Sequence, residues 1–294
     1  MRDQKEQYLQ SIQENYPNLS IQDASLQSHE GQYNDILIVN QQLIFRFPKF
    51  EEGLTTLRRE VNLLNQLQGL LTLSIPHPVY VSRNTETIGK VFMGYPKIRG
   101  EPLWHQRFQT IKDQQILAKM ALQLATFLRE LHAIPVDHLA LDLPVSDGPQ
   151  YWANLYDEIR LFLFPKMRPD ARNIIIEHFE KFLNHSELHS FEPTLRHGDF
   201  GSGNILFDHR DQTISGIIDF GSAGLGDPAV DIAAAMTFGE SFFNYYDDTY
   251  PEIKSLIGRA NFYKGTFALQ EALYGMKHDD HDAYERGIKL YLND

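Results

Sequence analysis

The sequence predicts an α+β fold, with strands in the first hundred residues and helices in most of the remainder. Two observations support this prediction. Apolar and polar residues alternate between residues 24 and 47, as they do in half-buried strands. After Gly100 the apolar residues take helical spacing, most clearly over residues 113–132. The buried stripe of that helix is predicted to consist of Leu117, Met120, Leu124, Phe127, Leu128 and Leu131.

The first hundred residues are predicted to run in the order helix, hairpin, helix, strands. An amphipathic helix is expected at residues 3–15 and another at 54–68. The segment at residues 28–32 is rich in turn formers, and Asn40–Gln42 reads as a second turn. Strands are expected at Ile36–Val39, Leu43–Phe47, 75–82 and 90–98.

The second part of the chain is predicted to be helical around one hairpin. Residues 133–150 contain three prolines and read as a loop, and residues 152–187 read as helix. The segment from Thr194 is predicted to be a loop that runs into a strand, and the polar turn Asp208–Gln212 joins that strand to a second one. Asp227 and Pro228 are favoured at the N-cap and first position of a helix, so a helix is expected to open there.

Composition excludes several classes of protein. The chain has 294 residues and a formal net charge of −12, so we expect no nucleic-acid partner and no anionic membrane partner. It has no cysteine, which excludes disulfides, thiolate-bound zinc and cysteine catalysis. The N-terminus does not resemble a signal peptide, and no apolar run reaches the length of a membrane span, so a cytoplasmic location is expected.

Two motifs combine the groups that phosphoryl transfer from a nucleotide requires. His197-Gly198-Asp199 precedes Asn204, which lies five residues after Asp199, and Asp219 stands in Ile-Asp-Phe-Gly. A carboxylate must lie beside the attacking hydroxyl, and Mg²⁺ prefers hard oxygen ligands. Asp199 is therefore the candidate base, and Asn204 and Asp219 are the candidate metal ligands.

These motifs resemble the aminoglycoside phosphotransferase family, in particular its 2″-phosphorylating branch. The resemblance implies a protein-kinase-like fold of two lobes. Residues 1–95 would form a nucleotide-binding lobe with an antiparallel sheet, 96–100 a hinge, and 101–294 a mainly helical lobe. It also implies a monomer that uses Mg²⁺ and ATP or GTP to phosphorylate a small cationic or hydroxylated molecule. In this family, residues matching His197 and Asp231 brace the catalytic loop.

The same resemblance suggests the nucleotide contacts. Ser28 would lie in the loop that covers the phosphates, although this turn is not a glycine-rich loop. Arg46 stands where the family usually has a lysine that contacts phosphates and pairs with a helix glutamate, here Glu60. Lys49 is the alternative, but three residues along a strand it should point to the opposite face. Pro96 and Ile98 would flank the purine, and the Ile98 N–H is the expected donor because proline has none.

The acceptor site is predicted from charge and from the resemblance. Residues 225–294 contain twice as many acidic as basic side chains, and Glu240, Glu271 and Tyr274 are the candidate acceptor contacts. Arg46 and the stretch Gly226–Ile232, which leads to Phe238-Gly239-Glu240, also resemble macrolide phosphotransferases. Ala233–Phe238 is apolar, whereas 2″-type enzymes are acidic there, so a macrolide or another hydroxyl metabolite is the alternative acceptor. A catalytically silent nucleotide-binding protein is a third hypothesis. A protein kinase is not expected, because no Ala-Pro-Glu segment follows Gly221.

Overall fold

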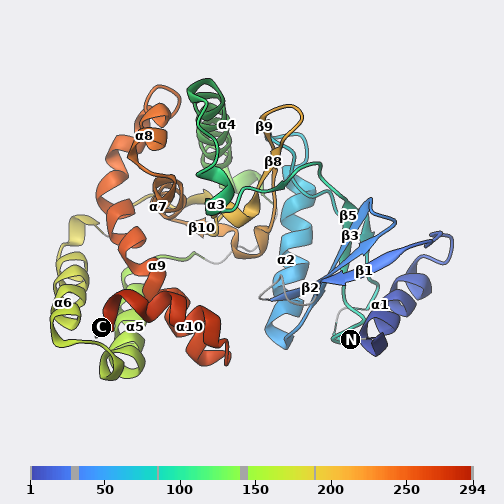
Figure 1. Cartoon of the computed structure of the whole chain (residues 1–294), viewed down its shortest axis with the longest axis horizontal. Helices are drawn as coiled ribbons and strands as arrows, with labels where there is room; N and C mark the ends of the chain where they lie inside the picture. The colour runs from blue at the N-terminus through green and yellow to red at the C-terminus, as the bar shows by residue number, and fades with distance from the viewer. Residues whose placement is uncertain (1, 28–32, 85, 140–144, 189, 293–294) are drawn as a thin grey trace. The chain divides into compact units, whose positions relative to one another are not determined.

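The computed structural model describes residues 2–27, 33–84, 86–139, 145–188 and 190–292, and the chain divides into two compact units (Figure 1). Unit 1 comprises Met1–Glu130, Asp137–Asp142 and Gly201–Ala223, and unit 2 comprises Leu131–Val136, Leu143–Phe200 and Gly224–Asp294. This partition differs from the predicted lobes, because residues 201–223, which contain the hairpin around the predicted turn Asp208–Gln212, group with the N-terminal part of the chain. The hinge at residues 96–100 therefore stays a prediction.

Unit 1 contains a five-stranded antiparallel sheet with the strand order β1-β2-β3-β5-β4. The predicted hairpin is present, since β2 and β3 pair along six residues. The predicted strand over residues 75–82 shortens to two residues, consistent with the prolines that precede it. The strands are β1 (Ala24–Gln27), β2 (Asn34–Val39), β3 (Leu43–Pro48), β4 (Tyr80–Val81) and β5 (Met93–Pro96).

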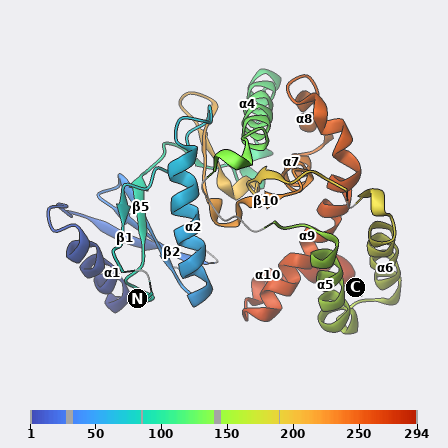
Figure 2. The same cartoon turned by 180° about the vertical axis from the view of Figure 1, so that it is seen from behind.

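Two helices cover opposite faces of this sheet (Figures 1 and 2). Helix α1 (Arg2–Asn15) buries Tyr8 and Ile12 against alternate residues of β2 and β3, among them Leu37 and Phe45. Helix α2 (Glu51–Leu67) lies on the other face, where Arg46 of β3 reaches Glu60. Alternation along β3 thus sends its aromatic side chains to one helix and its one charged side chain to the other.

A second sheet in unit 1 has the order β6-β8-β9. Strand β6 (Glu101–Pro102) pairs with β8 (Ile205–Asp208), and β8 forms a hairpin with β9 (Thr213–Ile217) around the predicted turn. Backbone groups of Ser74 and Ile217 connect this hairpin to the segment after α2. The remaining α-helices of this unit are α3 (His105–Phe108) and α4 (Gln114–His132). The last two residues of α4, Leu131 and His132, belong to unit 2.

Unit 2 is mainly helical, and α9 packs against α6, α7 and α10 (Figure 2). Its aromatic core includes Trp152, which stacks on Tyr263, and Phe182, which stacks on Phe262. Its α-helices are α5 (Pro149–Glu158), α6 (Pro169–Leu183), α7 (Ala229–Ala235), α8 (Glu240–Phe243), α9 (Ile257–Lys277) and α10 (His281–Ile288). The helical structure predicted for residues 152–187 is present, but a π-helical turn at Ile159–Leu163 and a short 3₁₀ turn divide it.

Two local predictions near the catalytic motifs need correction. The segment before His197 was expected to be loop, but Thr194–Arg196 forms strand β7, which pairs with β10 (Gly224–Gly226). Helix α7 begins one residue later than predicted, after Pro228 rather than at it. Asp227 still accepts a hydrogen bond from the Ala229 N–H, and it also binds Arg259 and Tyr263, so its carboxylate does more than cap the helix.

The α+β class is confirmed. None of the helices in the described ranges has the length and hydropathy that crossing a bilayer requires.

Candidate active site

The β8–β9 hairpin of unit 1 places Asn204 and Asp219 at the same open end. Asn204 directly precedes β8, and Asp219 lies two residues after β9. The Ile218 N–H donates to the Asn204 carbonyl at 2.9 Å, so the backbones of the two candidate metal ligands adjoin each other. Asp219 has φ of 64° and ψ of 70°, a left-handed conformation that aspartate and asparagine tolerate better than most residues. The chain turns sharply there.

Arg46 connects this end of the hairpin to helix α2. Its Nη1 donates to Glu60 Oε1 at 2.5 Å and its Nη2 to Asp219 Oδ1 at 2.7 Å. The Phe220 N–H also donates to Glu60 Oε1, at 3.1 Å. Arg46 and Glu60 are buried, whereas 44% of the Asp219 side chain remains exposed. The planar guanidinium therefore bridges two carboxylates, and one of them is open to a ligand.

Burial and charge shift the pKa values of this cluster. Burial raises the pKa of Glu60 to about 7; Arg46 lowers it and Asp219 raises it further. Burial lowers the pKa of Arg46, but Asp219 and Glu60 more than offset this and raise it, so the guanidinium stays charged. The cluster thus keeps a fixed positive charge beside the open Asp219 carboxylate.

Lys49 lies in a different environment from Arg46. Its Nζ is 3.7 Å from Asp35 Oδ1, and Asp35 also accepts hydrogen bonds from Tyr8 and Gln4 of α1. Of the two candidates, Arg46 is the one that the structure brings to Glu60 and Asp219. Ser28 lies outside the described residues.

The sheet face that carries Arg46 also carries three half-buried isoleucines, Ile36, Ile38 and Ile44. Ile36 pairs with Arg46 and Ile38 with Ile44 across β2 and β3, so the four side chains share one face. Sequence reasoning missed these residues, although the alternation in Asn34–Val39 contained the signal. They form an apolar surface beside a charged cluster, which suits a base linked to phosphates.

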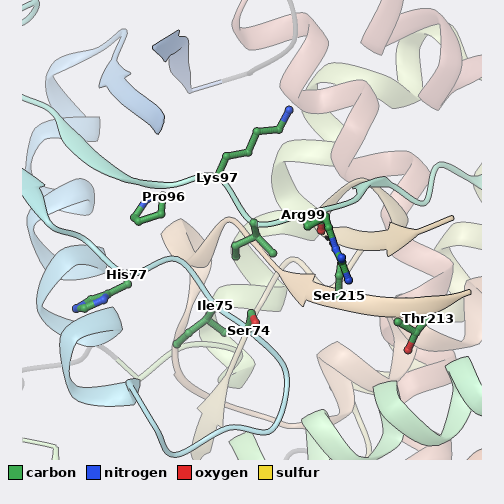
Figure 3. Close-up of a pocket in the computed structure, with 9 residues that line it drawn as sticks. Ser74, Ile75, His77, Pro96, Lys97, Arg99, Thr213 and Ser215 are labelled. Carbon is green, nitrogen blue, oxygen red and sulfur yellow. Dashed lines mark hydrogen bonds between the residues drawn. The ribbon is translucent and has the colours of Figure 1, made fainter. Parts of the chain in front are cut away.

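The predicted hinge residues lie where β5 ends. The Lys97 N–H donates to the Gln42 carbonyl, whereas the Ile98 N–H has no acceptor within the described residues. Pro96 and Ile98 line a pocket of about 420 Å³ together with the segment after α2 and strand β9 (Figure 3). Arg46, Glu60 and Asp219 are not among its lining residues, so this pocket is separate from the charged cluster.

Figure 3 shows how the polar side chains of that pocket are used. The Ser215 hydroxyl donates to the Arg99 carbonyl, and the Arg99 side chain pairs with Asp208 and Asp211. Lys97 points away from the hollow. The pocket lacks a converging set of free polar groups, and we assign it no catalytic role.

In unit 2, Asp231 braces the loop that contains Asp199. Its two carboxylate oxygens accept the N–H groups of His197 and Gly198 at 2.7 and 2.8 Å. His132 Nε2 lies 3.0 Å from Asp231, and His132 Nδ1 lies 3.0 Å from the Tyr250 hydroxyl. Burial raises the pKa of Asp231, but His132, His197 and Arg196 outweigh it and hold the pKa below the usual value. Asp231 therefore stays ionised and fixes the backbone just before Asp199.

A second buried network holds the same loop from strand β7. Arg196 directly precedes His197 and donates to Asp147 at 2.6 and 3.1 Å. Asp147 also accepts the Asp227 N–H. Within the loop, the Asp199 N–H donates to His197 Nδ1 at 3.3 Å. Sequence reasoning missed His132, Asp147, Arg196 and Tyr250, because these partners lie 49 to 118 residues apart in the chain and share no local motif.

The candidate acceptor residues of unit 2 are not all brought together. Glu240 is exposed at the start of α8. Glu271 and Tyr274 both lie on α9; Glu271 binds Arg286 of α10 at 2.8 Å, and the Tyr274 ring lies against His278. The apolar character of 233–238 follows from packing, since Ala233, Ala235 and Phe238 are buried. Ala234 and Met236 are half-buried and Thr237 is exposed, so part of the stretch remains open.

Asn204 and Asp219 fit a magnesium ion that is bound jointly with a nucleotide. In the described part of the chain, no group of three or more histidine, aspartate or glutamate side chains could hold a metal by itself. Mg²⁺ is commonly held by one or two protein oxygens plus phosphates and water, which is the ligand number available here.

Comparison with known proteins identifies the family. The model of the phosphotransferase enzyme family matches residues 27–260. The chain belongs to this family. Viomycin phosphotransferase from Streptomyces vinaceus is 27% identical over 276 residues, which covers 90% of this chain and 91% of that protein.

Solved phosphotransferase structures share the fold across nearly the whole chain. The GDP and kanamycin complex of APH(2")-IIia has a TM-score of 0.87 and 29% identity, with 96% of each chain covered. The GDP complex of wild-type aminoglycoside 2'-phosphotransferase-IIIa has a TM-score of 0.87 and 28% identity, with 97% of this chain and 96% of that chain covered. Macrolide 2'-phosphotransferase type I has a TM-score of 0.77 at 19% identity and covers 100% of this chain and 98% of that one, so it indicates the fold alone. This protein is therefore a kinase-type phosphotransferase that uses a nucleotide.

Proposed function

We propose that this phosphotransferase transfers the γ-phosphoryl group of ATP or GTP to a hydroxyl group of an aminoglycoside. The observation that carries the proposal is the Arg46–Glu60–Asp219 cluster at the open end of the hairpin that bears Asn204. It combines a fixed cation with an open carboxylate, which suits the phosphates of a nucleotide and the metal that accompanies them. The kanamycin and GDP complex of a structural relative at 29% identity supports the acceptor class.

The proposed reaction assigns a separate task to each residue. Asp199 orients the acceptor hydroxyl and takes its proton, while the hydroxyl oxygen forms a bond to the γ-phosphorus. The bond between the γ-phosphorus and the bridging oxygen breaks, and the nucleoside diphosphate leaves. Arg46 holds the α- and β-phosphates. When bound to Asn204 and Asp219, Mg²⁺ neutralises charge on the phosphate oxygens.

The remaining contacts are proposed from the placement of the residues. Ile98 is proposed to present its N–H to the purine beside Pro96, and the isoleucine face of β2 and β3 to cover the base. Ser28 and Lys49 remain candidates for the outer phosphates. We propose that amino groups of the acceptor are contacted by Glu240, Glu271 and Tyr274. Glu271 would then either give up its ion pair with Arg286 or bind Arg286 and the acceptor together.

A transfer assay tests the proposal. Purified protein is incubated with Mg²⁺, either ATP or GTP, and a panel containing kanamycin, gentamicin, viomycin and a macrolide. Mass spectrometry then measures the gain of one phosphoryl group on each compound. We expect phosphorylation of at least one aminoglycoside. Modification of viomycin or the macrolide alone would reassign the acceptor, and nucleotide binding without modification of any compound would support the silent-protein hypothesis.

Asp199→Asn separates the chemical step from binding. This substitution keeps the size of the side chain and removes its basicity, so we expect kcat to fall by about 10²- to 10⁴-fold. Nucleotide affinity, measured by calorimetry, should not change. The exposed Asp248→Asn removes the same charge elsewhere in unit 2 and should leave kcat intact. A variant at position 199 that retains kcat would show that another group accepts the proton.

A further inference from the structure

Trp104 is an exposed aromatic residue that lies against the turn preceding the β8–β9 hairpin. It follows β6, and the pairing of β6 with β8 continues through the Leu103 N–H, which donates to the Ile205 carbonyl at 2.8 Å. This pairing carries Trp104 to the start of β8, beside the turn Ser202–Asn204. Its place is therefore set by backbone hydrogen bonds on the residue before it.

The six-membered edge of the indole lies directly on Gly203. A Cβ built on Gly203 would come within 2.6 Å of Trp104 Cζ3 and 2.8 Å of Cη2, so any side chain at position 203 would displace the ring. Gly203 immediately precedes Asn204, a candidate metal ligand. The glycine thus allows an indole to rest one residue away from the group that is proposed to hold the metal and phosphates.

The rest of the ring is available to a ligand. Trp104 is 59% exposed, an unusual state for so large an apolar side chain. Within the described residues it has no ring–ring contact, and its indole N–H has no acceptor. By contrast, the chain's other tryptophan, Trp152, is 3% exposed and packed among aromatic rings of unit 2.

The proposed nucleotide contacts of the described chain lie in the same unit as Trp104. The Ile98 N–H and the isoleucine face are suited to the base, while Arg46, Asn204 and Asp219 are suited to the phosphates. The ribose is covalently placed between base and phosphates. Trp104 has a similar intermediate position. The chain leaves the predicted hinge at residue 100 and pairs with β8 through β6, and this pairing leads it to Trp104 beside Asn204.

We propose that the exposed face of Trp104 packs against the ribose of the donor nucleotide and contributes to its affinity. This inference rests on the proposed function. Because ATP and GTP share the same ribose, Trp104 strengthens the binding of both and does not discriminate between them. Its loss should leave the recognition of bare phosphate groups unchanged.

Tryptophan fluorescence provides a direct test. Acrylamide should quench Trp104 strongly in the free protein, and saturating Mg²⁺ with a non-hydrolysable GTP or ATP analogue should protect it. Trp104→Phe should abolish the protectable signal, while Trp152→Phe should retain it. If Trp152→Phe folds poorly, the difference between wild type and Trp104→Phe assigns the signal without that variant.

Affinity measurements give the second readout. In Trp104→Ala we expect the Kd of both nucleotide analogues to rise about tenfold, the effect of losing roughly 55 Å² of apolar contact at about 25 cal/mol per Å². Trp104→Phe, which retains a ring, should change the Kd by less than about threefold. The Kd of magnesium tripolyphosphate, which has no ribose, should be the same in all three proteins.

The outcomes separate this inference from the proposed function. If the wild-type protein binds neither analogue in calorimetry, the proposed function itself fails. If the analogues bind but leave acrylamide quenching and the Trp104→Ala affinity unchanged, only the ribose contact is overturned. Protection of Trp104 by kanamycin in the absence of nucleotide, with none by the analogues, would overturn it in favour of an acceptor contact.

Discussion

At the scale of single residues, the Arg46 side chain links helix α2 to the end of the β8–β9 hairpin. A lysine ammonium is a compact charge, whereas the guanidinium presents separate nitrogens to Glu60 and Asp219. Arg46→Lys is therefore not a conservative change here, although both side chains are cations. The two carboxylates would have to share one donor group.

Glu60 gives the clearest pH-dependent prediction at this scale. Its pKa is raised from 4.5 to about 7, so folding favours its protonated form. Its contribution to stability is fully present below pH 4.5 and is lost as the pH rises through 7. Glu60→Gln mimics the protonated state and removes this dependence. The unfolding free energy of wild type minus that of Glu60→Gln should fall by about 3 kcal/mol between pH 4.5 and 8.

Urea denaturation across this pH range measures the difference. Asp113→Asn, at an exposed helix start, provides a control that should show no such trend near pH 7. If the unfolding free energy of wild type minus that of Glu60→Gln rose with pH, the attraction of Arg46 for the ionised Glu60 would outweigh the effect of burial.

At the scale of elements, the loop that contains Asp199 is held by buried carboxylates from other elements of unit 2. Asp231 on α7 and Asp147 before α5 hold the two residues that precede Gly198. Both are buried carboxylates with several donors each. Their role is to keep the backbone of the loop in one conformation.

Removing the Asp231 charge should therefore cost both stability and rate. Asp231→Ala leaves two backbone N–H groups and His132 without an acceptor, and we expect a loss of about 3–5 kcal/mol in unfolding free energy. Asp231→Asn keeps one acceptor oxygen and should lose less. Folding lowers the pKa of Asp231 from its usual value of 3.8. The stability that its ionised form contributes is therefore complete above pH 3.8 and is lost as the pH falls through the pKa of the folded protein. Equal stability of the alanine variant and wild type would exclude the bracing role.

Strand β9 makes a second prediction at this scale. A Cβ on Gly216 would lie 2.7 Å from the Ser74 carbonyl oxygen and 2.8 Å from Ile98 Cγ2. Gly216→Ala should therefore push Ser74 and Ile98 away from strand β9 and lower the free energy of unfolding by about 1–3 kcal/mol. Gly258→Ala in α9 has no atom in its way and should stabilise the protein by up to about 1 kcal/mol. Thermal unfolding of the two variants tests this pair, and a stable Gly216→Ala would contradict it.

For the molecule as a whole, the net charge of −12 has a consequence for acceptor binding. A polycationic acceptor should be attracted over a distance that salt shortens, since the Debye length falls from about 30 Å at 0.01 M to about 8 Å at 0.15 M. The KM for an aminoglycoside should therefore rise several-fold over this range. The KM for an uncharged acceptor analogue should stay nearly constant. Identical salt dependence for both would remove long-range charge as a factor.

Sequence reasoning succeeded where the chemistry is local. Asn204 and Asp219 flank a short hairpin, so a motif and a turn were enough to place them at the same end. It failed where partners are distant: β7 and β10 have three residues each, and two of the residues of β10 are glycines without strand propensity. The Asp147–Arg196 pair joins residues 49 positions apart with no shared motif. Trp104 gave no signal because an exposed tryptophan is not distinguishable from a buried one by residue type.

The left-handed backbone of Asp219 also determines how this position can be probed experimentally. An alanine there would remove the carboxylate and at the same time impose a backbone penalty of about 1–3 kcal/mol. Loss of activity in an alanine scan would then mix misfolding with missing chemistry. Asparagine adopts the same conformation readily, so we expect Asp219→Asn to give an inactive but correctly folded enzyme.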